Sequence, residues 1–206
     1  MRTIANVRRA FSLVEMLIAL TITATLFTAT LVALDAAFKG YKHTTEGAST
    51  HVVSRIVMSR IMTMVRTGTE FGPYPADPLD PELNPVHSNF IEFVAVDDPE
   101  NLYQRIVRIE RRDAANSSSG PYELWYIQTE FENEVETNRQ ELPLLTNLED
   151  VRFTLTYDVG PRLLEATIDL TVKPNDVQDA NVGGTLDAPV VRFVSTVAPR
   201  KLDEEN

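Results

Sequence analysis

An apolar segment near the N-terminus constrains this chain more than any other feature. Residues 11–34 form a run of 24 residues that contains a single charged side chain, Glu15. As an α-helix, a run of this length extends about 36 Å, more than the roughly 30 Å of a bilayer's hydrocarbon core. The segment therefore predicts a membrane-spanning helix.

The ten residues before this run are basic. Arg2, Arg8 and Arg9 lie there without any acidic residue, and positive charge on this side favours a cytoplasmic N-terminus. We therefore expect a single-pass chain whose remaining residues lie across the membrane, in the periplasm or outside. A cleaved secretory signal is a poorer interpretation, because its apolar region spans about 7–15 residues and ends at a small-residue site.

Glu15 is out of place in an apolar helix. A carboxylate at the centre of a membrane costs several kcal/mol, and less towards the headgroups. Glu15 lies near the N-terminal end of the run, so two interpretations are open. The carboxyl group reaches the headgroup region, or it awaits a positively charged partner in an assembly.

Residues 8–15 (RRAFSLVE), followed by the apolar run, resemble the class III signal of type IV pilins and type II secretion pseudopilins. The usual pattern in that family is a basic residue, Gly, then Phe-Thr-Leu-x-Glu and an apolar helix. This sequence departs from the pattern in having Ala10 in place of Gly. It also lacks the proline that kinks the helix of many major pilins, because no proline occurs between Phe11 and Phe71.

The resemblance implies how the chain is processed and assembled. A prepilin peptidase would cleave between Ala10 and Phe11, after the basic pair Arg8 and Arg9, and Phe11 would become the N-methylated first residue. Glu15 would neutralise the N-terminal amine of an adjacent subunit. The implied partners are the prepilin peptidase, other pilins or pseudopilins, and the inner-membrane assembly platform.

The helix is expected to continue beyond the membrane. Past Gly40 and Gly47, apolar residues recur at helical spacing, and Gly68 and Pro73 mark the end of the pattern. Such an amphipathic helix needs a sheet to cover its apolar stripe. The stripe consists of Val53, Ile56, Val57, Ile61, Met64 and Val65.

The rest of the chain reads as strands after a proline-rich loop at residues 72–85. The predicted strands are residues 89–96, 104–111, 122–131, 150–158, 163–172 and 190–197. Short connections favour antiparallel pairing, so we predict an α+β fold with a long N-terminal helix packed on an antiparallel sheet, which is also the pilin-like arrangement. The only tryptophan, Trp125, is expected to be largely buried. The stretch 142–153 resembles the larger minor subunits, nearest a J-type minor pseudopilin or a W-type minor pilin.

Composition excludes several other functions. The net charge of −11 argues against nucleic-acid binding, and the absence of cysteine excludes disulfides, thiolate zinc sites and a cysteine nucleophile. No GxSxG, HExxH or P-loop pattern occurs, and His43 and His51 are too far apart for a paired ligand, so no enzyme, cofactor or metal is predicted. Two acidic clusters, Glu130 to Glu136 and Asp176 to Asp187, are interpreted as solvated loops, with calcium binding as the alternative.

These patterns lead to a structural assembly subunit as the favoured function. Residues 1–10 would be the cleaved leader, 11–34 the transmembrane and assembly helix, and 35–206 the periplasmic globular domain. The chain would lie in the inner membrane and enter a filament or its tip. The alternative is a single-pass, membrane-anchored periplasmic binding domain that never polymerises and retains residues 1–10.

Overall fold

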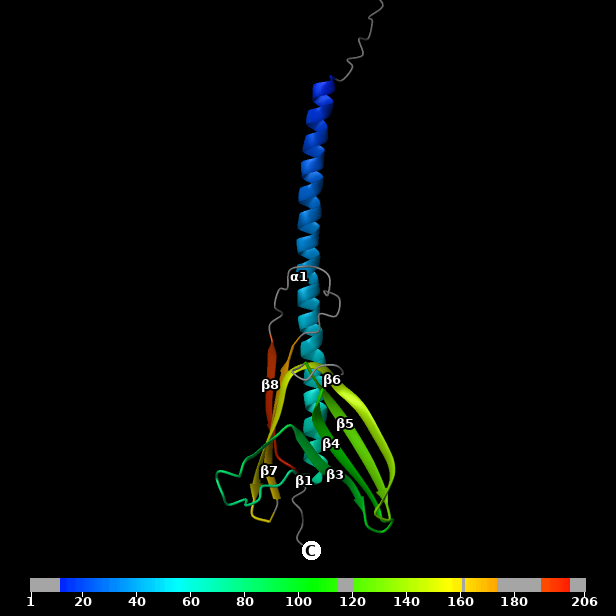
Figure 1. Cartoon of the computed structure of the whole chain (residues 1–206), viewed down its shortest axis with the longest axis vertical. Coiled ribbons are helices and arrows are strands. Elements are labelled where there is room, and N and C mark those ends of the chain that lie inside the picture. Colours follow the sequence, from blue (N-terminus) through cyan, green and yellow to red (C-terminus); the bar gives the residue numbers. More distant parts are fainter. Residues whose placement is uncertain (1–11, 115–120, 161, 174–189, 201–206) are drawn as a thin grey trace, which may run out of the picture. The chain divides into compact units, whose positions relative to one another are not determined.

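One long helix and one antiparallel sheet make up the described part of the chain (Figure 1). The computed structural model describes residues 12–114, 121–160, 162–173 and 190–200. The chain divides into two compact units, Met1–Thr45 and Glu46–Asn206, and the division falls within helix α1 (Leu13–Thr67). The predicted α+β class is confirmed.

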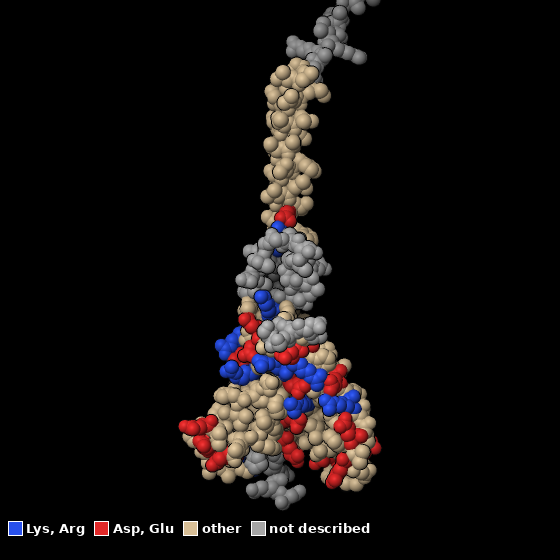
Figure 2. Space-filling view, viewed as in Figure 1, with Lys and Arg blue, Asp and Glu red and all other residues tan. Residues whose placement is uncertain are grey.

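The first unit contains the membrane-length part of α1. Its segment Leu13–Lys42 is apolar and long enough to cross a membrane, and none of it is buried. This segment runs eight residues past Leu34, the end of the predicted span. Asp35 and Lys39 form an i,i+4 ion pair of 2.9 Å towards its C-terminal end. Figure 2 shows the described helix before that point without charged side chains on the visible face.

Threonine is frequent in this apolar segment, and each hydroxyl is satisfied within the helix. Thr21 donates to the carbonyl oxygen of Ile18 at 2.8 Å, and Thr23 donates to that of Ala19 at 2.8 Å. Thr25, Thr28 and Thr30 make equivalent bonds to carbonyls three or four residues earlier. In lipid, a polar group without a partner is costly, so these bonds let the segment carry hydroxyls and still remain compatible with a membrane.

In the second unit, the remainder of α1 packs on the sheet. Val57, Ile61 and Val65 are buried against it at successive turns. Two members of the predicted stripe are wrong: Val53 is 44% exposed and Ile56 is 62% exposed. The buried residues Val57, Ile61 and Val65 follow one another at intervals of four and form one stripe along the helix. Ile56 comes one residue before Val57, so its side chain is rotated by about 100° around the helix axis, away from this stripe.

The helix ends where the chain approaches the sheet most closely. Thr67 is the last helical residue, and the Gly68 N–H donates to the Met64 carbonyl at 3.0 Å. A Cβ at Gly68 would come within 2.5 Å of Phe93 Cδ2. Only glycine therefore lets the helix end lie against this ring.

The sheet has eight antiparallel strands in the order β1-β3-β4-β5-β6-β7-β8, with β2 paired to β6. All six predicted strands are present. The sequence did not predict β1, β2 or the first half of β6. The proline-rich residues 73–85 lie between the short strands β1 and β2. The strands are β1 (Thr69–Gly72), β2 (Val86–Ser88), β3 (Phe90–Asp98), β4 (Tyr103–Asp113), β5 (Tyr122–Glu132), β6 (Val135–Asp158), β7 (Arg162–Val172) and β8 (Val191–Val197).

Strand β6 is 24 residues long and joins the two halves of the sheet. Its first part, up to Leu148, pairs with β5, and its later part pairs with β7. The turn before it consists of Asn133 and Glu134, whose φ angles of 52° and 64° suit a two-residue hairpin. The acidic cluster predicted as a loop is therefore a tight β-hairpin.

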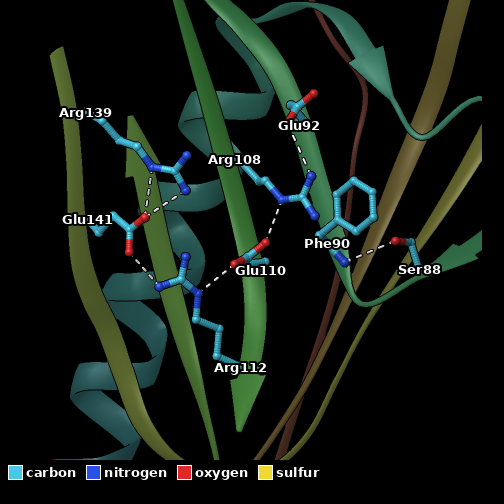
Figure 3. Close-up of polar contacts among 8 residues, drawn as sticks. All are labelled: Ser88, Phe90, Glu92, Arg108, Glu110, Arg112, Arg139 and Glu141. Carbon is cyan, nitrogen blue, oxygen red and sulfur yellow. Dashed lines mark hydrogen bonds and ion pairs between the residues drawn. The ribbon is translucent and has the colours of Figure 1, made fainter. Parts of the chain in front are cut away.

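A line of paired charges covers the sheet face away from α1 (Figure 3). On β4, Arg108, Glu110 and Arg112 alternate with the buried Val107 and Ile109, which places the charged side chains on the outer face. Glu110 accepts from Arg108 and from Arg112, at 2.6 Å each. We call this group the charge ladder: Glu92, Arg108, Glu110, Arg112, Arg139 and Glu141.

Trp125 lies on this outer face and not in the core, and its side chain is partly buried there. Its indole Nε1 donates to Glu123 Oε2 at 2.8 Å. The guanidinium of Arg112 lies 5.0 Å from the ring centroid. Trp125 follows the buried Leu124 in the strand, so its ring points to the opposite face of the sheet. Charged side chains cover the ring there.

The arginines of the charge ladder lower the pKa of its carboxyl groups. Hydrogen bonds from Arg112 and then Arg139 lower the pKa of Glu141 from 4.5 to about 2. Partial burial alone would raise the pKa of Glu110, but hydrogen bonds from Arg112 and Arg108 outweigh it, so that this pKa is also lowered. Both carboxylates therefore favour the folded state at neutral pH.

We predict that acid unfolding reflects Glu141. Because its pKa is lower in the folded state, its contribution to stability is present above about pH 4.5 and is lost as the pH falls towards about 2. Glu141→Gln should remove this component, so its melting temperature should fall less steeply than that of the wild type in this window. The control is Glu165→Gln, which changes an exposed carboxylate without an ion pair among the described residues. Equal slopes for Glu141→Gln and the wild type would contradict the prediction.

Candidate functional site

The N-terminal end of α1 is closed by two reciprocal hydrogen bonds. The Glu15 backbone N–H donates to Ser12 Oγ at 3.2 Å, and the Ser12 backbone N–H donates to Glu15 Oε2 at 2.9 Å. Ser12 directly precedes the first helical residue, Leu13. This is a capping box, in which the pattern Ser-x-x-Glu satisfies two backbone donors that the helix leaves unpaired.

The capping box gives Glu15 a role within its own helix. The unpaired N–H groups make a helix N-terminus electropositive, which favours a carboxylate in the first turn. The pattern S-x-x-E before an apolar run was visible in the sequence, but it was missed because Glu15 was read only as a charge in the membrane. Its second carboxylate oxygen accepts no hydrogen bond from the described residues, so it remains able to meet another donor.

A shallow groove runs along α1 from Glu15. Ala19, Thr23, Ala24 and Phe27 are among the residues that line it. Ala19 and Thr23 follow Glu15 at intervals of four residues, so they lie on the same helix face. Small side chains at this spacing let a second helix approach closely in a membrane.

The processing residues lie outside the described part of the chain. Arg8, Arg9, Ala10 and Phe11 all precede residue 12, so no geometry is given for the predicted junction. Of the predicted site residues, Glu15 alone is described. The second acidic cluster, Asp176 to Asp187, also lies outside the described residues.

Other candidate ligand groups are not brought together. The His51 ring makes an edge contact with Phe193, with ring centroids 5.6 Å apart, and the side chain of His43 is not described. Among the residues that the structure describes, no three His, Asp or Glu side chains form a group that could hold a metal ion.

Comparison with protein families identifies the N-terminal pattern. The family model described as the prokaryotic N-terminal methylation motif matches residues 5–31. This range contains the Ala10–Phe11 junction, the capping box and the groove below it. A search of curated proteins and of solved structures finds no match. The motif supports the superfamily of pilins and pseudopilins, and membrane anchoring through the N-terminal helix.

We predict that Ser12→Ala loosens the first turn of α1. Loss of an N-cap hydroxyl costs about 1 kcal/mol, so amide exchange at Glu15 and Met16, whose N–H groups are bonded to Ser12, should become about fivefold faster. The measurement is hydrogen exchange on the uncleaved full chain in detergent micelles. Ser12→Thr keeps a hydroxyl cap and should exchange like the wild type. Unchanged exchange in Ser12→Ala would show that the capping box does not stabilise this turn.

Proposed function

We propose that this chain is the precursor of a structural subunit of a type II secretion pseudopilus or a type IV pilus. The observation that carries the proposal is the methylation motif at residues 5–31, which overlaps the start of a membrane-length helix. A soluble enzyme has no use for either feature. The apolar side chains of Leu13–Lys42 are exposed. Such a segment can contact lipid in the membrane and later pack against the helices of neighbouring subunits.

Processing occurs on the cytoplasmic side of the inner membrane. Arg8 and Arg9 hold the leader in the cytoplasm, a prepilin peptidase cleaves between Ala10 and Phe11, and Phe11 is then N-methylated. Cleavage removes three arginines and no acid. The 19 basic side chains become 16 against 30 acidic ones, which gives a mature side-chain charge of −14.

Glu15 then acts between subunits. Cleavage creates an amine at Phe11, one residue before the capping box, and an ammonium in an apolar environment needs a counter-charge. The carboxylate of Glu15 in an adjacent subunit supplies it. The capping box already orders this side chain at the helix start, and the groove beside it offers room for a neighbouring helix.

We propose that residues 35–206 form a periplasmic domain and that the chain is one of the larger minor subunits, nearest the J-type minor pseudopilin or the W-type minor pilin. The stretch 142–153 and the extended sheet support this assignment. The sheet has eight strands, and its longest strand, β6, contains the whole stretch. The chain waits in the inner membrane as a single-pass protein and enters the filament or its tip, with the assembly platform and other pilin-like chains as partners.

We predict cleavage after Ala10. Membrane-extracted protein from cells with an active prepilin peptidase should begin at N-methylated Phe11, as shown by intact mass and N-terminal sequencing. The matched control is the same strain without the peptidase, where residues 1–10 should be retained. Recovery of only the full-length chain from the peptidase-positive strain would favour an anchored domain that does not polymerise.

We predict that Glu15→Leu separates insertion from assembly. Removing a carboxylate from the apolar run should leave insertion and cleavage intact. Incorporation into sheared filaments should fall at least about tenfold, because an unpaired buried ammonium costs several kcal/mol. The measurement is the sheared fraction relative to total membrane protein.

Glu15→Gln distinguishes the charge from the cap. Gln can still accept the Ser12 N–H in a capping box but carries no charge, so this variant should assemble as poorly as Glu15→Leu. Normal assembly of Glu15→Gln would assign the role to helix capping, and normal assembly of both variants would remove Glu15 from the assembly mechanism.

A further inference from the structure

We infer that the face of α1 turned away from the sheet binds a helix of a different pilin-like subunit, one that presents carboxylates to Arg55 and Arg60. We call this surface the Arg55–Arg60 face. It consists of Val52, Arg55, Ile56, Ser59, Arg60 and Thr63. The inference rests on the proposed assembly function, and it names the chemistry of one partner.

The Arg55–Arg60 face is apolar where a solvent-facing helix would be polar. Val57 and Ile61 fill the contact with the sheet, whereas Val52 is 58% exposed and Ile56 is 62% exposed. These two lie four residues apart on one side of the helix, and a shallow groove runs past them from Ala48 to Met64. A helix that has already buried one side and still exposes branched apolar residues on the other has a second surface to cover.

The charge of this face is unbalanced. Residues 47–69 contain Arg55, Arg60 and Arg66 but no acidic residue, although the whole chain carries a net charge of −11. In the described part of the chain, neither Arg55 nor Arg60 forms an ion pair; Arg60 only lies 5.9 Å from the ring centroid of Tyr126. Most arginines in the described strands differ. Five of the eight are paired with a carboxylate, namely Arg108, Arg111, Arg112, Arg139 and Arg192. Arg105, Arg152 and Arg162 form no ion pair with any described residue, but no apolar surface like that at Val52 and Ile56 is described around them.

The missing carboxylates point to another protein and not to a second copy. Two copies side by side would place arginine against arginine. Bringing Glu46 of one copy opposite Arg55 of the other requires a shift of nine residues, about 14 Å along the helix, and then leaves Arg60 without an acid. Arg55 and Arg60 are five residues apart, about 7.5 Å along the helix axis and about 140° around it, so they flank the two edges of the apolar contact at Val52 and Ile56. A different helix with a carboxylate at each edge of its own contact surface satisfies both arginines at once.

The two parts of the surface have separate tasks. Exposed ion pairs contribute little affinity, so Val52 and Ile56 supply the buried contact. Opposite charges discriminate strongly against wrong partners, so Arg55 and Arg60 select the neighbour and set its register.

The test is site-specific photo-crosslinking of the full chain in its own cells. A photoreactive phenylalanine analogue replaces Ile56 in one strain and Leu20, in the membrane-length segment, in another. The probes are the other chains of the same organism that carry a prepilin motif, each tagged in turn. From position 56, we expect a crosslink to a helix of one such chain. The crosslinked residue of that helix should lie within one helical turn of two acidic residues.

Charge reversal then tests the arginines. Arg55→Glu with Arg60→Glu should lower the crosslink yield at position 56 at least about tenfold, and replacing the partner's two carboxylates by Lys should restore it. The control, Arg152→Glu with Lys173→Glu, makes the same change of charge at two exposed positions elsewhere and should leave the yield unchanged. Arg55→Gln with Arg60→Gln, which introduces no repulsion, should give a smaller loss in the same direction.

Each other outcome overturns the inference. These outcomes are a crosslink from position 56 to the same chain, to lipid or to a strand of another chain, and a yield that charge reversal does not change. Crosslinks from position 20 report assembly itself. If position 20 gives crosslinks to other chains with a prepilin motif and position 56 gives none, only the partner assignment is wrong. If neither position gives such crosslinks, the proposed assembly function is wrong as well.

Discussion

The packing of the second half of α1 against the sheet is the contact on which the unit Glu46–Asn206 depends. Ile61 and Val65 are completely buried between the helix and the strands, together with Ile91, Ile109 and Phe153. The sheet's other face carries the charge ladder, with the buried Ile127 paired opposite Arg108. Among the described residues, the main core cluster lies between α1 and the sheet. Substitutions in the stripe would affect folding before they affect assembly.

Much of this arrangement could be predicted because periodicity reports burial directly. The alternation of β7 and the helical spacing of Val57, Ile61 and Val65 reflect contact with one core, and the predicted elements match the structure there. The failures have a different origin. Strands β1 and β2 have four and three residues, too few for a pattern, and their pairing depends on partners distant in sequence. The first half of β6 is exposed and lacks an apolar face, although β5 supplies its hydrogen bonds.

Single side chains were harder to place than elements. Trp125 was expected to be largely buried from its place in a predicted strand, and its position in β5 puts it on the charged face, where Glu123 and Arg112 contact it. Ile56 was assigned to the apolar stripe by its helical spacing, although it is 62% exposed. At the N-terminus, the sequence pointed to Glu15 and to the processing motif. It did not point to the partner of Glu15 in its own helix, because capping is a local backbone interaction and not a property of a charge in an apolar run.

The strand order of the sheet has a consequence for the order in which its strands can form. From β3 to β8, every strand pairs with the next one in sequence. Contacts between sequence neighbours form early, so the sheet can grow one strand at a time. The contact between the N–H of Arg200 and the carbonyl of Arg66 joins the end of the described chain to the end of α1. It can form only after β8 has been added, so it marks the completed domain.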